Sequence, residues 1–345
     1  MGTGPVEKLQ VRQRLESLEE NLSPHASRSS RSLGRERDET PSPLRTEFQR
    51  DRDRIIHTNA FRRLKHKTQV FLAPSGDHYV TRLTHTLEVA QVGRTIARAL
   101  NLNEDLVEAM SYGHDLGHTP FGHLGEETLD QVYAPGFAHS AQSLRIVEHL
   151  AREGEGLNLT WEVRQGIISH SKPQGDFLDI KLDESLTLEG QILRLADSVA
   201  YLNHDIADAV RAGMLKIEDL PERANRILGN THSQRLDALI TAIVQDSWLA
   251  SGLSDEESDG KPVISMDQET RDAMMELRDY MFQHIYLPLG NTRQSEVGRD
   301  VVKLLYHYFV ANAEEIPAPY FSPGADPERA AVDYVAGMTD HYAIR

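Results

Sequence analysis

SYGHDLGHTPFGHLGEE, residues 111–127, places a histidine and an aspartate side by side at the end of an apolar run. That run is expected to be helical, and the position that follows Leu106 and Met110 at the same spacing of four is His114. Its imidazole should therefore point inward. Asp115 comes next, and the glycine and proline after it should break the helix where a cavity can open. An isolated His-Asp pair is, however, more often a hydrogen-bonded core histidine than a metal site.

Two other helical patterns carry polar residues on their buried faces. His85 begins a stripe that continues through Val89 to Ile96, and Asp197 follows Leu193 by four. A carboxylate among apolar side chains is costly unless it is paired or bound to a metal. With no cysteine in the chain, a metal would have to be held by His, Asp or Glu. Two buried histidines and two inward carboxylates from three helices would suit a divalent transition metal ion.

The order His, His-Asp, Asp resembles the ligand set of the HD superfamily. Longer strings, in the right order, resemble the bacterial deoxyguanosine triphosphate triphosphohydrolase family from about Leu33 to Asp340. These strings are RTEFQRDRDRIIHTNAFRRLKHKTQVF at 45–71, RLTHTLEVAQVGR at 82–94, GHDLGHTPFGHLGE at 113–126, HSAQSLRIVE at 139–148 and VDYVAGMTD at 332–340. The resemblance implies four metal ligands, His85, His114, Asp115 and Asp197. A His/Asp set of this kind accepts manganese, magnesium, iron, nickel or cobalt.

His123 and Glu126 stand three residues apart just past the expected helix break, so they should lie on one side of the following helix. In the family this pair is the catalytic one. An alkoxide is a poor leaving group, and the resemblance implies that His123 protonates the departing 5′-oxygen of the sugar. Glu126 would orient His123 and stabilise its charged form. The alternative is an ordinary surface His-Glu pair.

Three residues resemble family positions that contact phosphate. His118 and His139 match two further histidines of the family site, and Arg82 matches an arginine whose guanidinium fork suits a phosphate. Ser140, after His139, stands where the family more often has asparagine, a departure that affects secondary contacts more than the chemistry.

Three others resemble positions that hold the deoxyribose. Gln69 and Asp205 would bind the 3′-hydroxyl, and the ring of Tyr201 would fill the space of a 2′-hydroxyl. Ordinary core packing is the alternative for Tyr201. His170 and His204 have the spacing of capped or core histidines and are not assigned to the site.

Apolar residues recur mostly at spacings of three and four, which predicts an all-α protein. We expect a mobile N-terminal segment, 1–45, whose second half is rich in Ser and Arg, an HD-type helical core, 46–215, and a C-terminal helical extension, 216–345. Period-two alternation is confined to 69–72 and 77–81, which form a candidate hairpin.

The net charge of -16 argues against a general nucleic-acid-binding protein, which needs a broad positive face. Basic residues nevertheless outnumber acidic ones between Arg28 and Lys67, where a polyanionic substrate could be met. No apolar stretch approaches the length needed to span a bilayer, and the first residues lack the apolar centre of a secretory signal. These features, with the absence of cysteine, predict a cytoplasmic protein without a membrane partner.

The resemblance implies hydrolysis of dGTP, or of several dNTPs, to a deoxynucleoside and inorganic tripolyphosphate. One alternative is an HD phosphohydrolase for a monophosphate, a cyclic nucleotide or a stringent-response nucleotide, which would not need the sugar-binding residues. Another is a non-catalytic oligomer that binds nucleotides or single strands. The family also implies a homo-oligomer, with a hexamer as the candidate state, and its relatives include proteins with a regulatory nucleotide. Single-stranded DNA is a further candidate partner.

Overall fold

The computed structural model describes residues 9–70, 79–171, 186–254, 260–321 and 326–345. Within these ranges the chain is helical, and the only β pairing is an isolated antiparallel bridge between Thr68 and Thr81. The predicted all-α fold is therefore confirmed. Most of the candidate hairpin lies outside the described residues. The bridge pairs the residue just before the candidate hairpin, Thr68, with its last residue, Thr81.

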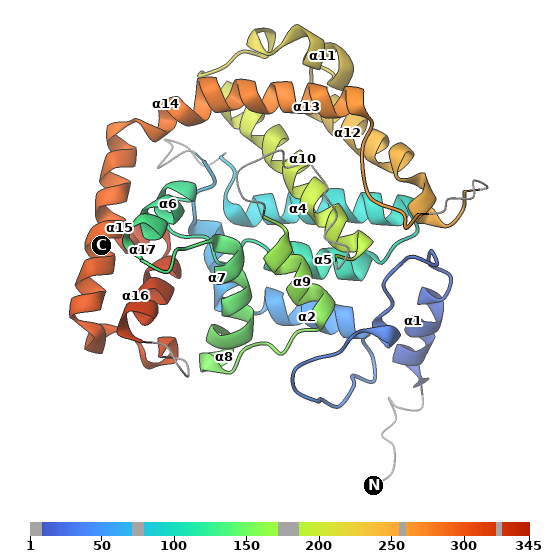
Figure 1. The fold of residues 1–345 in the computed structure, drawn as a ribbon, viewed down its shortest axis with the longest axis horizontal. Coiled ribbons are helices and arrows are strands. Elements are labelled where there is room, and N and C mark those ends of the chain that lie inside the picture. Colours follow the sequence, from blue (N-terminus) through green and yellow to red (C-terminus); the bar gives the residue numbers. More distant parts are fainter. Residues whose placement is uncertain (1–8, 71–78, 172–185, 255–259, 322–325) are drawn as a thin grey trace.

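Three helices form the centre of the molecule, α4 (Arg82–Ala99), α5 (Glu104–Gly113) and α10 (Leu188–Arg211) (Figure 1). Each begins at a residue whose side chain accepts a hydrogen bond from a backbone N–H of the first turn. These residues are Thr81, Asn103 and Thr187. The caps fix the first residue of each helix. They therefore also determine which side chains of α4 and α10 face each other.

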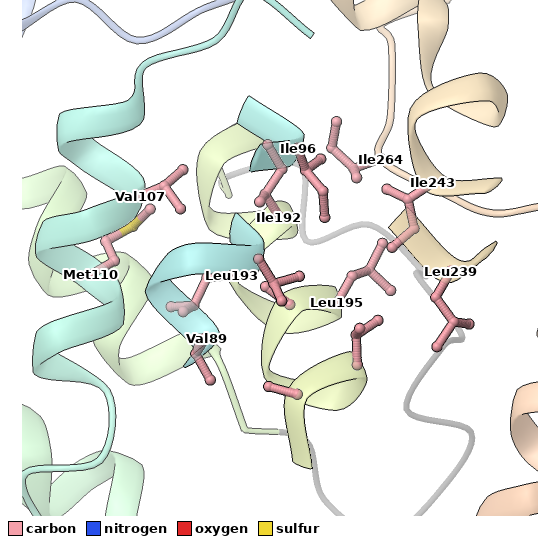
Figure 2. Packing of buried hydrophobic residues seen from close by; sticks show 14 of the residues in the cluster. Val89, Ile96, Val107, Met110, Ile192, Leu193, Leu195, Leu239, Ile243 and Ile264 are labelled. Atoms are coloured by element: carbon pink, nitrogen blue, oxygen red, sulfur yellow. The ribbon is translucent and has the colours of Figure 1, made fainter. Parts of the chain in front are cut away.

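The central helices bury a continuous apolar core, shared with α12 (His232–Asp246) (Figure 2). Val89, Val107 and Ile192, one from each central helix, are almost completely buried. Gly93 brings α4 and α5 close together, because a Cβ added there would lie 2.7 Å from Cγ1 of Val107. This close packing holds the helix ends that carry the site residues.

The other helices surround this centre. They are α1 (Val11–Glu19), α2 (Glu47–Ile56), α3 (Asn59–Arg63), α6 (His123–Val132), α7 (His139–Arg145), α8 (Ala151–Gly154), α9 (Trp161–Ser169), α11 (Glu222–Leu228), α13 (Gln268–Met281), α14 (Leu287–Gly290), α15 (Arg293–Ala311), α16 (Pro327–Ala336) and α17 (Asp340–Ile344). Two π-helical turns, Ile146–Leu150 and Phe282–Tyr286, extend α7 and α13. Among the described helices, none combines the length and apolar character that crossing a membrane requires.

The C-terminal helices pack on α6 through a second apolar cluster. Leu129 of α6 is buried with Tyr306 of α15 and Val332 of α16. In Figure 1, α15, α16 and α17 lie together beside α6, at the side of the molecule away from α1. The chain after α14 therefore covers the helix that begins with His123.

Two polar residues also join the C-terminal helices to the segment before α6. The buried ammonium of Lys67 donates to the backbone carbonyls of His118 and Ala336, the latter at 2.8 Å. The carboxylate of Asp340 accepts two hydrogen bonds from backbone N–H groups, that of Phe121 at 3.0 Å and that of Thr68 at 2.9 Å. Burial lowers the pKa of Lys67 to about 7.

Residues 24–45 contribute no α-helix and contain one short 3-10 turn. The segment nevertheless rests on the core. The backbone N–H and hydroxyl of Ser27 both donate to the buried carboxylate of Glu189 in α10, each at 2.9 Å. Glu39 pairs with Arg54 of α2. Ser and Arg side chains thus supply polar anchors in a segment that the composition predicted to be mobile.

Candidate active site

The four side chains expected to bind a metal come together from three helices. His85 lies in the first turns of α4, His114 ends α5 with Asp115 directly after it, and Asp197 lies in the middle of α10. Nε2 of His85 is 3.2 Å from Oδ1 of Asp197 and 3.8 Å from Oδ2 of Asp115. Nε2 of His114 is 3.5 Å from Oδ1 of Asp115 and 4.0 Å from Oδ1 of Asp197. Both nitrogens thus lie within 4.0 Å of both carboxylates, and the ligand atoms of His85, His114 and Asp115 all lie within 4.8 Å of one another.

The hydrogen bonds of His114 fit a metal ligand. Its Nδ1 lies 2.6 Å from the carbonyl oxygen of Ser111, so the proton of the neutral ring is on Nδ1. Nε2 is then a bare acceptor, and this buried atom has no hydrogen-bond partner among the described residues. A nitrogen lone pair beside two carboxylates forms, with their oxygens, a set of donor atoms for a cation. The donor set therefore suits a divalent metal ion.

Both carboxylates are held in the charged form that a cation needs. Burial by itself would raise the pKa of Asp115, but His114, His118 and Arg82 hold it well below its usual value. The pKa of Asp197 is likewise lowered, against the effect of burial, by the hydrogen bond with His85 and by the neighbouring imidazoles. Both groups are therefore ionised at neutral pH.

A chain of side chains on α10 supports His85. Nδ1 of His85 lies 2.9 Å from Nε2 of His204, and Nδ1 of His204 lies 2.8 Å from Oδ1 of Asp205. Asp205 raises the pKa of His204 against the effect of burial. The contact with His204 holds the His85 ring with its Nε2 toward the two carboxylates. A carboxylate or second ring behind a ligand histidine orients it in this way in metal proteins.

His123 and Glu126 lie together as the spacing predicted. His123 is the first residue of α6, its side chain is 66% exposed, and its Nδ1 is 3.2 Å from Oε2 of Glu126. The other oxygen of Glu126 is 2.7 Å from Nδ1 of His139, whose backbone N–H also donates to it at 2.8 Å. Burial would raise the pKa of Glu126, but these two histidines hold it well below its usual value. One carboxylate thus serves two imidazoles.

Arg82 and His118 lie between the metal-binding group and this pair. Arg82 donates from Nη1 to Oδ2 of Asp115 at 2.8 Å, while its buried Nε and Nη2 have no hydrogen-bond partner among the described residues. Nε2 of His118 is 3.3 Å from Oδ1 of Asp115, and its ring stacks on His139 with centroids 3.9 Å apart. Burial and the positive charge of Arg82 keep the pKa of His118 well below its usual value, so its ring is neutral.

All of these groups except His114, Glu126 and His204 line one cavity of about 850 Å³, a volume typical of small-molecule sites. Gln69, Tyr201 and Asp205, the expected sugar-binding residues, line it as well. Oε1 of Gln69 is buried and has no hydrogen-bond partner in the described part of the chain. Asp205 accepts a hydrogen bond of 2.7 Å from the hydroxyl of Tyr286. The twelve predicted site residues therefore lie in one region.

The structure adds three residues that the sequence reasoning did not assign to the site. His170, at the end of α9, has Nε2 3.1 Å from Nε2 of His139. His204 stands behind His85, and Tyr286 contacts Asp205. His170 follows Ile167 by three residues, which also places the two on one helix face, so a similar argument could have found it. Tyr286 comes from the π-helical turn after α13, which carries no comparable signal.

Comparisons with known proteins match nearly the whole length of the chain. The HD domain family matches residues 82–202, and the family described as phosphohydrolase-associated domain matches residues 264–345. The chain is 49% identical to the deoxyguanosinetriphosphate triphosphohydrolase-like protein of Caldanaerobacter subterraneus subsp. tengcongensis, over 97% of this chain and 94% of that one. The proteins of the same name from Desulfatibacillum aliphaticivorans and Clostridium perfringens are 45% and 44% identical, over 97% of this chain and 96% and 95% of theirs.

Proposed function

The chain belongs to the family of HD-domain deoxyguanosinetriphosphate triphosphohydrolase-like proteins, and from this we propose that it hydrolyses deoxynucleoside triphosphates, dGTP or several dNTPs, to a deoxynucleoside and inorganic tripolyphosphate. One observation carries the proposal. The Nε2 atoms of two histidines lie within 4.0 Å of two ionised carboxylates from neighbouring elements, beside a cavity where Arg82 has N–H groups without a partner among the described residues. The family makes the chain a metal-dependent phosphohydrolase of the HD class; the substrate and products are the proposal.

The metal-binding group is His85, His114, Asp115 and Asp197. A divalent ion bound there would polarise an α-phosphate oxygen and lower the pKa of a bound water toward neutrality. The unpaired Nε and Nη2 of Arg82 point to a second contact with the phosphates, since a buried guanidinium with free donors is costly unless an anion meets it. His118 and His139 are suited to the remaining phosphate oxygens.

The last part of the proposed reaction concerns His123. The new bond forms between the water oxygen and the α-phosphorus, and the bond from that phosphorus to the sugar 5′-oxygen breaks. The leaving oxygen needs a proton, which we assign to His123 because it lines the cavity and contacts an ionised carboxylate. Glu126 orients His123 and, through its other oxygen, also fixes His139.

The sugar would lie between α10 and the segment before α4. The unpaired Oε1 of Gln69 and the carboxylate of Asp205 are acceptors suited to a 3′-hydroxyl proton. Tyr201, four residues before Asp205 on α10, has the ring that would occupy the place of a 2′-hydroxyl. The ring of Tyr201 would exclude a 2′-hydroxyl only by steric contact, so we expect a moderate preference for deoxyribose over ribose.

The test is direct. Purified protein is incubated with each dNTP, singly and mixed, and with GTP, in the presence of manganese, magnesium, iron, nickel or cobalt, and the products are separated by ion-exchange chromatography. We expect tripolyphosphate and a deoxynucleoside in equal amounts. Pyrophosphate or orthophosphate would instead indicate a different HD phosphohydrolase, and no turnover of any nucleotide would indicate a non-catalytic binding protein. Faster turnover of one dNTP in the mixture than alone would reveal a regulatory nucleotide.

A further inference from the structure

The turn between His118 and His123 has an unusual backbone. Phe121 and Gly122 have φ angles of 63° and 62°, in the left-handed region. Phenylalanine rarely adopts this conformation, because its Cβ crowds the backbone, so neighbouring contacts must hold it there. The hydroxyl of Thr119 closes the turn by donating to the carbonyl of Gly122 at 2.8 Å. His123 follows directly as the first residue of α6, so its position depends on what holds Phe121.

The C-terminal helices hold both the side chain and the backbone of Phe121. Its ring is buried in the apolar cluster that includes Val332 and Val335 of α16. Its backbone N–H donates to Oδ1 of Asp340, the first residue of α17, at 3.0 Å. The strained residue is therefore fixed from outside its own turn, by side chains more than 200 positions later in the sequence.

The carboxylate of Asp340 also holds the segment that carries Gln69. Its Oδ2 accepts a hydrogen bond of 2.9 Å from the backbone N–H of Thr68, the residue just before Gln69. Gly122 lies against the same segment, since a Cβ added there would lie 2.9 Å from the carbonyl oxygen of Gln69. One carboxylate therefore joins the turn before His123 to the segment of the expected sugar contact, at the place where the two are packed together.

We propose that Asp340 is a positioning residue of the proposed hydrolysis, which holds His123 within reach of the leaving sugar oxygen. The inference deepens the proposed function and rests on it for the role of His123. Asp340 is not among the residues that line the cavity of about 850 Å³, so it acts through the backbone and not by contact with the substrate. A proton donor must come within hydrogen-bond distance of its acceptor, and a misplacement of about 1 Å can lower a rate about 10²-fold.

A double-mutant cycle tests whether Asp340 acts through His123. Turnover of the dNTP that the wild-type protein hydrolyses fastest is measured with Mn²⁺ in the full-length protein. Asp340→Ala should lower kcat about 10-fold to 100-fold with little change in KM, because the phosphate contacts remain. In a protein that already carries His123→Ala, the same change should lower kcat by about threefold at most, since the group to be positioned is gone. A merely structural role would lower kcat equally in both backgrounds.

Asp326→Ala is the matched control. The carboxylate of Asp326 also accepts a backbone hydrogen bond near the start of a C-terminal helix, from Arg329 at 2.7 Å, but it is exposed, so kcat should not change. Asp340→Asn keeps one acceptor oxygen and should lower kcat less than Asp340→Ala; it takes the place of the alanine variant if circular dichroism shows that one to be unfolded. Unchanged kcat in the folded Asp340 variants, or equal reductions in both backgrounds, overturns the inference.

Hydrogen exchange measured by mass spectrometry tests the link without turnover. The backbone N–H groups of Phe121 and Thr68 should exchange about tenfold faster or more in Asp340→Ala, and at the wild-type rate in Asp326→Ala. The two proposals can therefore fail separately. Wild-type protein that releases no tripolyphosphate would remove the proposed function, while exchange would still report whether Asp340 holds the turn. Tripolyphosphate release at the wild-type rate by folded Asp340→Ala would remove the inference and leave the proposed function.

Discussion

Glu126 is the residue on which two roles of the site meet. Its two oxygens are used by different imidazoles, Oε2 by the exposed His123 and Oε1 by the buried His139. The carboxylate is ionised and shared, so a change at Glu126 would alter both the proposed proton donor, His123, and the proposed phosphate contact of His139. Substitution of Glu126 alone would therefore not separate the two roles, whereas substitution of either histidine would.

The first prediction compares two histidines with different assignments. His114→Ala removes a metal ligand, so we expect loss of the bound ion and of turnover together. His123→Ala removes the proposed acid and none of the four proposed metal ligands, so metal binding should persist while turnover falls about 10²–10⁴-fold. Elemental analysis and tripolyphosphate release measure the two effects. A near-normal rate in His123→Ala would show that the proton comes from another group.

Individual residues show how far sequence reasoning reaches. Spacing placed His85, His114 and Asp197 inward, and the structure agrees, because helical periodicity reports which face is buried. It could not show which buried histidines meet. His170 and His204 were judged core histidines, yet each contacts a site histidine from another helix. That distinction depends on how helices cross, which no local pattern encodes.

Among the elements, the segment 24–45 offers a test of pH dependence. Burial alone would raise the pKa of Glu39, but hydrogen bonds from Arg54 and Asn158 lower it to about 2. A folded-state pKa below the usual value of 4.5 means that Glu39 stabilises the protein above that pH and loses this contribution as the pH falls toward 2.

We therefore expect the unfolding free energy of wild-type protein to exceed that of Glu39→Gln near neutral pH, with the difference shrinking as the pH falls below about 4.5. Urea unfolding at several pH values measures it. Glu36→Gln, at the more exposed partner of another ion pair in the same segment, is the control and should show a smaller difference. Equal stability of Glu39→Gln and wild type near pH 7 would mean that the anchor contributes little.

The contact between α4 and α5 gives a prediction about packing. Alanine at Gly93 would put its Cβ 2.7 Å from Cγ1 of Val107. Overpacking of this kind costs about 1–3 kcal/mol, which we expect to exceed the gain of about 1 kcal/mol from replacing glycine in a helix. Urea unfolding should show a net loss of stability for Gly93→Ala. Gly290→Ala, where the nearest atom is 3.9 Å away, should not be destabilised.

Helices were predicted more completely than the segments between them. The pattern of apolar residues in α4, α5 and α10 gave their place in the core, since each has one buried face. The contacts of residues 24–45 were not predictable, because they join serine and arginine side chains to carboxylates far along the chain, such as Ser27 to Glu189. Composition alone shows that such a segment adds little apolar core, not whether polar contacts hold it.

At the scale of the whole molecule, the exposed side of α15 supports the expectation of a homo-oligomer. Val297, Leu304 and Tyr308 form a stripe at helical spacing and are 54%, 68% and 44% exposed. We expect light scattering to give a multiple of 38.8 kDa, with a hexamer as the candidate state. Leu304→Asp should shift the mass downward, and Leu33→Asp, at an exposed leucine elsewhere, should not. A monomeric wild-type protein would contradict this expectation.

The hydrogen bonds of Lys67 and Asp340 link the two family-matched regions, and they bear on whether these regions could have been inherited separately. The ammonium of Lys67 donates to the carbonyls of His118 and Ala336, and it would lose the second acceptor if α16 were absent. Without Asp340, the backbone N–H of Phe121 would lose its hydrogen bond to that carboxylate. We therefore expect that a gene truncated after the first region would encode a protein in which the segment between α5 and α6 has lost these contacts. The C-terminal region is not an optional attachment, and recombination that exchanges it between relatives should preserve activity only when both polar links are kept.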